Sequence, residues 1–181
     1  LVLTELPQQA QVVIIGGGVI GCSVAYHLTQ IGWTDVVLLE RKKLTSGTTW
    51  HAAGLVGQLR ATYNLTRLAQ YTTELYASLE QETGQSTGFR QNGSLAIASD
   101  KERFEEFVRG ASMASCFGLE AQVISPAEVR SLHPLVETDD LVGGVFLPKD
   151  GQTNPTDTAQ ALARGARNRG ARVFEDTRVT A

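Results

Sequence analysis

Residues near the start of the chain have the types and spacing needed to hold a dinucleotide. Gly16, Gly18 and Gly21 form a Gly-x-Gly-x-x-Gly pattern directly after an apolar run, residues 12–15, which predicts a strand. Glu40 ends a second apolar run, nineteen positions after Gly21. His51 then lies in a loop of small and hydroxyl-bearing residues. The pattern predicts a diphosphate site and a ribose-binding carboxylate, while the role of the imidazole stays open on these residues alone.

Each glycine of the pattern has a physical role. Gly16 permits the tight turn out of the strand, Gly18 lets the backbone approach a pyrophosphate, and Gly21 lets the helix pack closely on the strand. Because the helix begins near Val19, the backbone N–H groups of Val19 and Ile20 are expected to meet the phosphates at the positive end of the helix dipole. The alternative is a glycine-rich turn that binds nothing. The order of strand, turn, helix, second strand and acid argues against it.

The elements around these residues follow a β-α-β order. Residues 19–31 predict a helix that stops at Gly32, and helical spacing suggests an apolar face made of Ile20, Val24, Ala25 and Leu28. Residues 36–39 are apolar without alternation, as in a parallel strand covered on both faces. The first fifty residues therefore predict an α/β fold of the Rossmann-like kind.

The rest of the chain alternates helices with short strands. Further helices are predicted over 64–82, 101–116, from Ser125 to about His133, and over 154–168. Ser125 and Glu128 form a predicted capping box, and Asn154 is expected to start the last of these helices. In the first of these, one stripe is expected to pack in the core: Leu65, Leu68, Thr72, Leu75 and Leu79. Asn92-Gly93 predicts a hairpin turn between two short strands, and residues 178–180 have strand-like sequence.

Composition and charge exclude several classes of protein. The chain has 181 residues, of which 42% are hydrophobic and 19% charged, and its net charge is -3. This is ordinary for a globular protein and gives no reason to expect nucleic acid as a partner or a membrane span. Its two cysteines form no CxxC motif, which favours reduced thiols. The helix dipole could lower the pKa of Cys22, but a small side chain packed beneath the ligand is the favoured interpretation.

The whole chain resembles the amino-terminal part of the dimethylglycine and sarcosine dehydrogenases, flavoproteins of the D-amino-acid-oxidase-like superfamily. The matching segments are residues 13–18, 37–41, 45–55, 79–84 and 150–151, and the Trp-His-Ala-Ala-Gly loop at 50–54 is the most specific. The resemblance implies a Rossmann-like FAD-binding domain with part of an inserted α+β substrate-domain layer. We expect 1–85 to be the first part of the FAD-binding domain, 86–150 the insertion, and 151–181 a truncated return to the FAD-binding domain.

The same resemblance assigns roles to individual residues. In that family the loop histidine bonds covalently to the 8α-methyl carbon of the flavin, and His51 matches it. Arg41 is implied to lie beside Glu40 at the adenosine ribose, and the backbone of Val179 at the adenine, although Val179 also reads as an ordinary strand valine. The rest of the loop is placed along the flavin: Gly47, Thr48, Thr49, Ala53, Gly54 and Leu55. Neither a catalytic residue nor a metal ligand is predicted.

The implied activity is oxidative demethylation of dimethylglycine or sarcosine in one-carbon metabolism. The FAD takes a hydride equivalent from an N-methyl carbon of the amine, and the carbon is released as formaldehyde or passed to tetrahydrofolate bound in a later domain. The electron acceptor stays undetermined. The sequence begins without Met and ends in strand-like sequence, so we expect a fragment that is inactive alone. The expected location is the mitochondrial matrix if the protein is eukaryotic and the cytoplasm if it is bacterial.

Two alternatives stay open at this stage. The first is a nicotinamide-dependent dehydrogenase, because the glycine pattern also serves that cofactor. The second is a non-catalytic homologue similar to the regulatory subunit of pyruvate dehydrogenase phosphatase, which shares the Leu-His-Pro-Leu segment at 132–135 but lacks the loop histidine. The presence of His51 favours the enzyme.

Overall fold

The computed structural model describes residues 5–180, which form a mixed α/β protein. Contacts divide the chain into two compact units. The first unit contains residues up to Leu55, Leu75–Phe89, and the chain from Thr153 onward, and the second contains Val56–Glu74 and Arg90–Gln152. The expected division at residues 85 and 150 into a cofactor domain and an inserted substrate layer remains a prediction about function.

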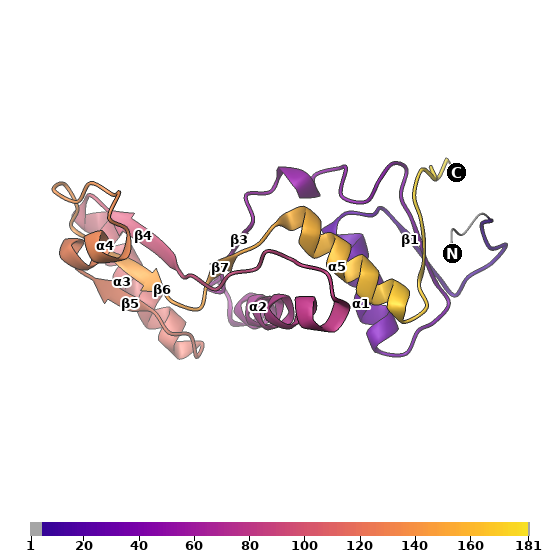
Figure 1. Ribbon diagram of the computed structural model, residues 1–181. Coiled ribbons are helices and arrows are strands. Elements are labelled where there is room, and N and C mark those ends of the chain that lie inside the picture. Colours follow the sequence, from indigo (N-terminus) through magenta and orange to yellow (C-terminus); the bar gives the residue numbers. More distant parts are fainter. Residues whose placement is uncertain (1–4, 181) are drawn as a thin grey trace. The chain divides into compact units, whose positions relative to one another are not determined.

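A three-stranded parallel sheet forms the centre of the first unit. It contains β1 (Val12–Ile15), β2 (Val36–Leu39) and β8 (Arg172–Phe174) in the order β1-β2-β8. Figure 1 labels β1 of this sheet. Val12 lies beside Val36 in the register. The two predicted strands of the β-α-β unit are therefore confirmed residue for residue.

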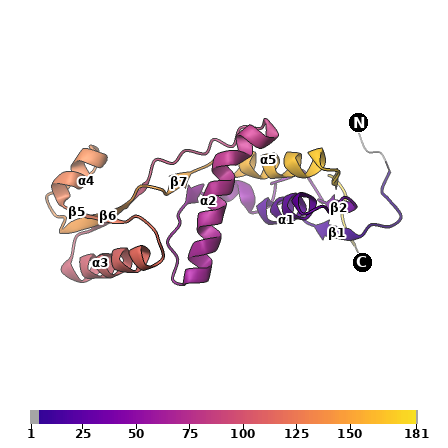
Figure 2. The ribbon, with the colours of Figure 1, turned by 90° about the horizontal axis from the view of Figure 1, so that it is seen from below.

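Two helices pack against each other beside this sheet, α1 (Val19–Gln30) and α5 (Pro155–Asn168) (Figure 2). The side chain of Asn154 accepts hydrogen bonds from the backbone of Thr156 and Asp157 and so caps α5. The predicted apolar face of α1 is confirmed for Ala25, which is buried, and for Leu28, which packs against the core. It is wrong for Ile20 and Val24, which are 75% and 43% exposed. The residues that α1 buries are Cys22, Ala25, Tyr26 and Thr29.

Helix α2 (Tyr63–Thr83) contributes its first part to the second unit and its last part to the first. The predicted core stripe is confirmed for Leu75 and Leu79, which join the core of the first unit. It is wrong for Leu65 and Leu68, which are 52% and 61% exposed. The reason is that each half of the helix packs in its own unit, so a single stripe along the whole helix does not describe its burial.

The second unit is built on an antiparallel sheet, β4 (Ser94–Ala98), β6 (Gly143–Leu147) and β5 (Gln122–Ile124), in the order β4-β6-β5. Helix α3 (Lys101–Cys116) and helix α4 (Pro126–Leu132) accompany the sheet. The capping box at the start of α4 is confirmed. Two short strands, β3 (Leu55–Val56) and β7 (Gly151–Gln152), form a separate two-stranded sheet.

The predicted hairpin at Asn92-Gly93 is wrong. Strand β4 pairs with β6 instead of with the residues just before it, among which Arg90 makes only an isolated bridge to Gln152. Gly93 does have a positive φ of 80°, but its N–H donates to the carbonyl of Asp150. The turn therefore redirects the chain without pairing its two flanks. Residues 178–180 also form no strand.

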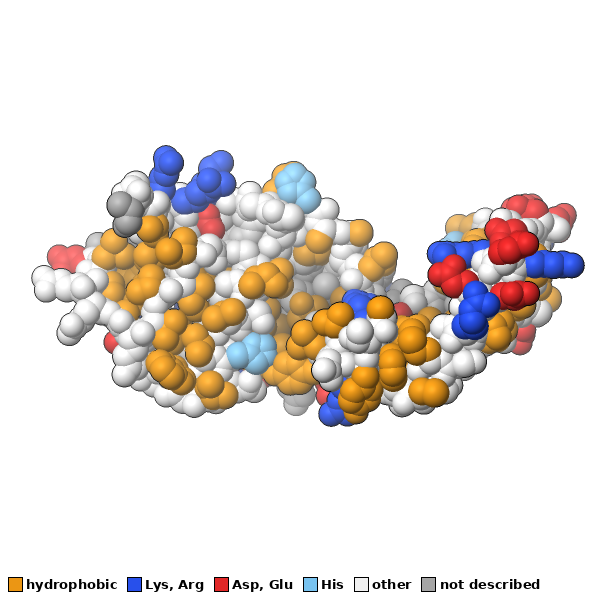
Figure 3. Space-filling view, turned by 180° about the vertical axis from the view of Figure 1, so that it is seen from behind, with side chains coloured by type: hydrophobic (Ala, Val, Ile, Leu, Met, Phe, Trp, Pro, Cys, Tyr) orange, Lys and Arg blue, Asp and Glu red, His pale blue; other side chains and the backbone are white. Residues whose placement is uncertain are grey.

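Apolar side chains remain exposed on the surface of the first unit, the left-hand part of Figure 3. On β1, Val13 is 52% and Ile15 70% exposed. On α1, Ile20 and Ile31 are 75% and 71% exposed. Among the described strands, β1 also lies at the edge of its sheet. Within residues 5–180, no helix combines the length and the apolar content that a membrane crossing requires.

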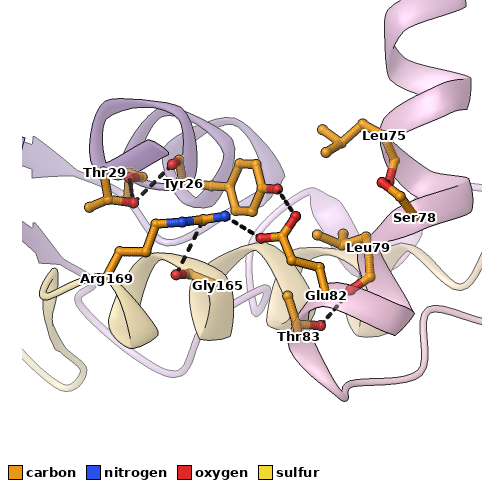
Figure 4. A network of polar contacts seen from close by, with 10 residues as sticks. Tyr26, Thr29, Leu75, Ser78, Leu79, Glu82, Thr83, Gly165 and Arg169 are labelled. Carbon is orange, nitrogen blue, oxygen red and sulfur yellow. Dashed lines mark hydrogen bonds and ion pairs between the residues drawn. The ribbon is translucent and has the colours of Figure 1, made fainter. Parts of the chain in front are cut away.

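A polar network joins three helices inside the first unit (Figure 4). The hydroxyl of the fully buried Tyr26 donates to Oε2 of Glu82 at 2.6 Å, and Arg169 forms an ion pair with the same carboxylate. The Arg169 guanidinium lies 4.8 Å from the centroid of the Tyr26 ring. Gly165 leaves room for that ring, because a Cβ there would lie 2.8 Å from it. Burial, followed by the hydrogen bond to Glu82, raises the pKa of the Tyr26 phenol.

Replacing Tyr26→Phe tests how much this network stabilises the first unit. The ring stays in place but Glu82 loses a donor, so we expect the free energy of unfolding to fall by about 1–2 kcal/mol. Urea denaturation followed by circular dichroism measures the change. The control is Glu105→Gln, which removes a surface ion pair with Arg109 and should leave the unfolding free energy unchanged. An unchanged midpoint in Tyr26→Phe would contradict a stabilising role.

Candidate functional site: a dinucleotide hollow

A hollow of about 620 Å³ lies at the carboxyl end of β1, where the chain turns into α1. Its walls come from the glycine turn, the start of α1, the residues after β2 and the loop that follows. Most of the predicted cofactor residues line it: Gly16, Gly18, Val19, Ile20, Gly21, Glu40, Arg41, Gly47, Thr48 and Thr49. Ligands of open parallel sheets bind at this end of the strands.

The glycine turn, residues 16–21, needs glycine where other atoms lie too close for a side chain or where φ is positive. A Cβ on Gly21 would collide with the carbonyl oxygen of Gly16, and Gly16 itself has a φ of 108°, which other residues rarely adopt. At Gly18 a Cβ would lie 3.0 Å from Oγ1 of Thr49. The N-cap of α1 is Gly18 and has no side-chain cap. The backbone N–H of Val19 donates to Oγ1 of Thr49 at 2.9 Å, so the predicted contact of this N–H with a phosphate is wrong, and an anion at this helix end would be met by the N–H groups that follow Val19.

Glu40 is tied to the glycine turn by its side chain. Its Oε2 accepts a hydrogen bond of 2.8 Å from the backbone N–H of Gly17, and its Oε1 accepts one of 2.9 Å from Lys42. The carboxylate is thereby fixed at the end of β2, beside the helix N-terminus. Each oxygen keeps a second lone pair, which a sugar hydroxyl can use. This is the position that the sequence predicts for a ribose-binding acid.

Gly17, which the glycine pattern leaves unspecified, connects three segments. Besides holding Glu40, its carbonyl accepts a hydrogen bond of 2.9 Å from the backbone N–H of Thr45. A Cβ at this position would collide with the side chain of Leu44 and lie 2.9 Å from Cβ of Glu40. Sequence reasoning missed Gly17 because its partners are more than twenty residues away and no local pattern reveals them.

The loop after β2 is anchored to the segment that follows β8. The backbone N–H of Leu44 donates to Oε1 of Glu175 at 2.7 Å, and Lys43 forms ion pairs with Glu175 and Asp176. Arg41 and Lys42, on the same loop, line the hollow. Two cations beside a helix N-terminus favour an anionic ligand.

The predicted histidine lies on a short 3-10 turn, η1 (Thr49–His51). Its backbone N–H donates to the carbonyl of Thr48 at 3.1 Å. The imidazole is exposed, and the indole of Trp50 lies against it with ring centroids 3.9 Å apart at an angle of 37°. The residues on either side of this pair, Thr49 and Ala52, line the hollow. His51 therefore belongs to the loop beside the hollow without lining it.

The remaining predicted residues lie outside the lining of the hollow. Ala53 is exposed, Leu55 is 82% exposed on β3, and Val179 is 39% exposed in irregular structure. Gly54 packs on the backbone of Thr153. The N–H of Thr153 donates to the carbonyl of Gly54 at 2.8 Å. Ala52 also lines the hollow and belongs to the stretch from Gly47 to Leu55 that the resemblance placed along the flavin. The lining residues that were not predicted are Ile14, Ile15, Val24, Lys42 and Ser46.

Cys22 lies under the glycine turn, in the first turn of α1. The residue is fully buried, and its thiol donates to the carbonyl of Gly17 at 3.6 Å. Burial raises the pKa of the Cys22 thiol to about 12, and the charge of Arg167 lowers it by less. The interpretation of Cys22 as a small packed residue is confirmed. The described residues also contain no group of three or more His, Cys, Asp or Glu side chains that could hold a metal ion.

The fold and the hollow define a dinucleotide-binding protein with a β-α-β cradle. A profile of the DAO family, described as FAD-dependent oxidoreductases, matches residues 11–181. The chain therefore belongs to the family of FAD-dependent oxidoreductases.

Known relatives cover nearly the whole chain. It is 48% identical over 176 residues to mitochondrial sarcosine dehydrogenase of Homo sapiens, covering 97% of this chain and 19% of that protein. It is 42% identical over 166 residues to mitochondrial dimethylglycine dehydrogenase of Rattus norvegicus, covering 92% and 19%. The mitochondrial pyruvate dehydrogenase phosphatase regulatory subunit of Mus musculus is 42% identical over 174 residues, covering 96% and 20%. The chain thus spans about a fifth of the length of these relatives.

Among solved structures, L-proline dehydrogenase from P. horikoshii matches with a TM-score of 0.90 at 28% identity. The match covers 97% of this chain and 46% of that one. The predicted Rossmann-like α/β fold class is confirmed by this likeness and by the parallel sheet.

Thiol labelling tests the buried state of Cys22. At pH 8 the neutral, buried Cys22 should not react with a disulfide reagent in the native protein, while the exposed Cys116 should react. Unfolding in urea should release the second of the two thiols. In a Cys116→Ser variant the native protein should show no reaction. Rapid labelling of that variant would disprove the assignment.

Replacing Gly17→Ala tests its role in holding Glu40. The new methyl group would push Glu40 and Leu44 away from the turn, so we expect the affinity for FAD to fall at least about tenfold, equivalent to 1.4 kcal/mol. Titration of flavin-free protein with FAD, followed by flavin fluorescence, measures this. The control is Gly110→Ala in α3, where a Cβ meets nothing within 4 Å. Equal FAD affinity in Gly17→Ala and wild type would contradict the proposed role.

Proposed function

We propose that the protein catalyses FAD-dependent oxidative demethylation of an N-methylglycine, sarcosine or dimethylglycine. The observation that carries the proposal is the pairing of an FAD-type cradle with His51 on the adjoining loop. Membership of the FAD-dependent oxidoreductase family and 48% identity to a sarcosine dehydrogenase support it. FAD, when bound, supplies the hydride acceptor for the N-methyl carbon.

In this proposal the chain holds the adenosine and diphosphate part of the cofactor. The N–H groups that follow Val19 at the start of α1 bind the diphosphate, with Arg41 and Lys42 adding positive charge. Glu40 binds the ribose through lone pairs that its backbone partners leave over. The loop from Gly47 to Leu55 follows the flavin, and the backbone of Val179 meets the adenine. These placements rest on the lining of the hollow and on the family resemblance.

We further propose that His51 holds the flavin covalently. The bond would join an imidazole nitrogen to the 8α carbon of the flavin ring. One hydrogen from the imidazole and one from the methyl group leave as two protons, and the two electrons pass to the flavin and then to its electron acceptor. The exposed position of His51, with Trp50 against one side of its ring, suits an imidazole that must meet a ligand.

Other parts of the proposal lie beyond these residues. The substrate contacts, the electron acceptor and a tetrahydrofolate site are not assigned to any residue of this chain. Two of the relatives named above are mitochondrial dehydrogenases, which supports a matrix location if the protein is eukaryotic. If the protein is bacterial, the expected location remains the cytoplasm.

A regulatory role remains the second candidate, because a phosphatase regulatory subunit is 42% identical to the chain. His51 argues against it, since the resemblance implies that this regulatory branch lacks the loop histidine. A nicotinamide-dependent dehydrogenase is disfavoured by the family match.

Replacing His51→Ala tests the covalent bond. Denatured wild-type protein should retain flavin fluorescence in a gel, and His51→Ala should lose it because no other nucleophile is expected to replace the imidazole. The matched control is His133→Ala, an exposed histidine at the end of α4, which should keep the fluorescence. Equal fluorescence in wild type and His51→Ala would rule out the bond. If denatured wild type shows none, the visible spectrum of the native protein decides between non-covalent FAD and a protein without flavin.

A further inference from the structure

Helix α1 begins without a capping side chain of its own. Its N-cap is Gly18, and its first turn contains no acidic residue. The first intrahelical hydrogen bond joins the N–H of Cys22 to the carbonyl of Gly18 at 3.0 Å, so the N–H groups before Cys22 need partners outside the helix. A side-chain oxygen that accepts a hydrogen bond from one of these N–H groups stabilises the start of a helix.

The group that caps α1 instead lies in the loop that contains His51, here called the histidine loop (residues 45–55), thirty residues later in the chain. Oγ1 of Thr49 accepts a hydrogen bond of 2.9 Å from the backbone N–H of Val19. Thr49 is only 8% exposed, unlike its neighbours Thr48 and Trp50. Gly18 makes the approach feasible, because a Cβ there would lie 3.0 Å from the same oxygen. The hydrogen bond is therefore enclosed by its surroundings and is not a chance surface contact.

We propose that Thr49 is a positioning residue that fixes the histidine loop to the phosphate-binding end of α1. His51 is the third residue of the turn that Thr49 begins. The hydrogen bond to Val19 thus sets the place of the imidazole relative to the helix end where the diphosphate binds. The inference rests on the proposed covalent role of His51. It assigns to the Thr49 hydroxyl a backbone partner within the protein, while Thr49 keeps the place along the flavin that the family resemblance implies.

This hydrogen bond assists covalent attachment of the flavin by orienting the imidazole of His51. A cofactor held at its diphosphate presents its ring at a fixed distance from the start of α1. An imidazole held to the same helix end meets that ring in the same geometry each time, and misplacement by about 1 Å can slow a reaction about a hundredfold. A threonine that merely stabilised α1 would change the melting temperature and leave the rate of attachment unaltered.

The test compares variants of flavin-free protein mixed with FAD. In Thr49→Val the hydroxyl is lost while the shape is kept, so we expect non-covalent FAD binding to persist and the rate of covalent attachment to fall at least about tenfold. Thr49→Ser, which keeps the hydroxyl, should attach at nearly the wild-type rate. The matched control is Thr29→Val, a buried threonine near the other end of α1, whose loss of hydroxyl affects stability only.

Hydrogen exchange provides a second measurement that needs no flavin. The Val19 amide should be protected in wild type and Thr49→Ser, and should exchange faster in Thr49→Val together with residues 49–54. If Thr49→Val does not fold, Thr49→Ala replaces it, and its comparison with Thr49→Ser isolates one oxygen atom. Attachment at the wild-type rate in the variants without the hydroxyl, or an unprotected Val19 amide in wild type, overturns the proposal. If wild type forms no covalent flavin, the function of His51 fails, and exchange alone decides the role of Thr49.

Discussion

The cofactor site depends on the contact between Gly21 and the carbonyl oxygen of Gly16. Any side chain at position 21 would collide with that oxygen, so only glycine lets α1 start so close to the end of β1. Because the helix starts there, its open N–H groups point into the space beyond the sheet, where Arg41 and Lys42 add positive charge. The remaining parts of the site are arranged around this helix end.

Three long-range hydrogen bonds gather those parts. Gly17 holds the side chain of Glu40 and the backbone of Thr45, and Val19 holds the side chain of Thr49. In each of these hydrogen bonds, one of the two partners is a backbone group of the glycine turn. The turn therefore also fixes the positions of Glu40, the proposed ribose-binding acid, and of the loop that contains His51. A substitution in the turn would disturb both, even where it does not touch the ligand.

The elements that carry the site could be predicted from local patterns, because glycines, caps and apolar runs act over a few residues. Strands β1 and β2 and the caps of α4 and α5 were found in this way. Burial could not be predicted as well. The stripe on α2 failed at Leu65 and Leu68 because the two halves of the helix pack in different units.

In the candidate site, too, local patterns predicted some residues and missed those whose roles depend on distant contacts. The glycines and Glu40 follow a spacing rule that physics explains, whereas His51 gained its role only from a family resemblance. The contribution of Gly17 and the partner of Thr49 had no sequence signal, since each depends on a contact between segments more than twenty residues apart. The predicted hairpin at Asn92-Gly93 failed for a related reason: the partner strand, β6, lies some fifty residues later in the chain.

Strand β1 has a further consequence for how the chain behaves in solution. Among the described residues it pairs on one side only, and two of its four side chains, Val13 and Ile15, face solvent. An open, apolar strand edge is a template on which another chain can add a strand. The chain is therefore expected to self-associate through β1 as its concentration rises.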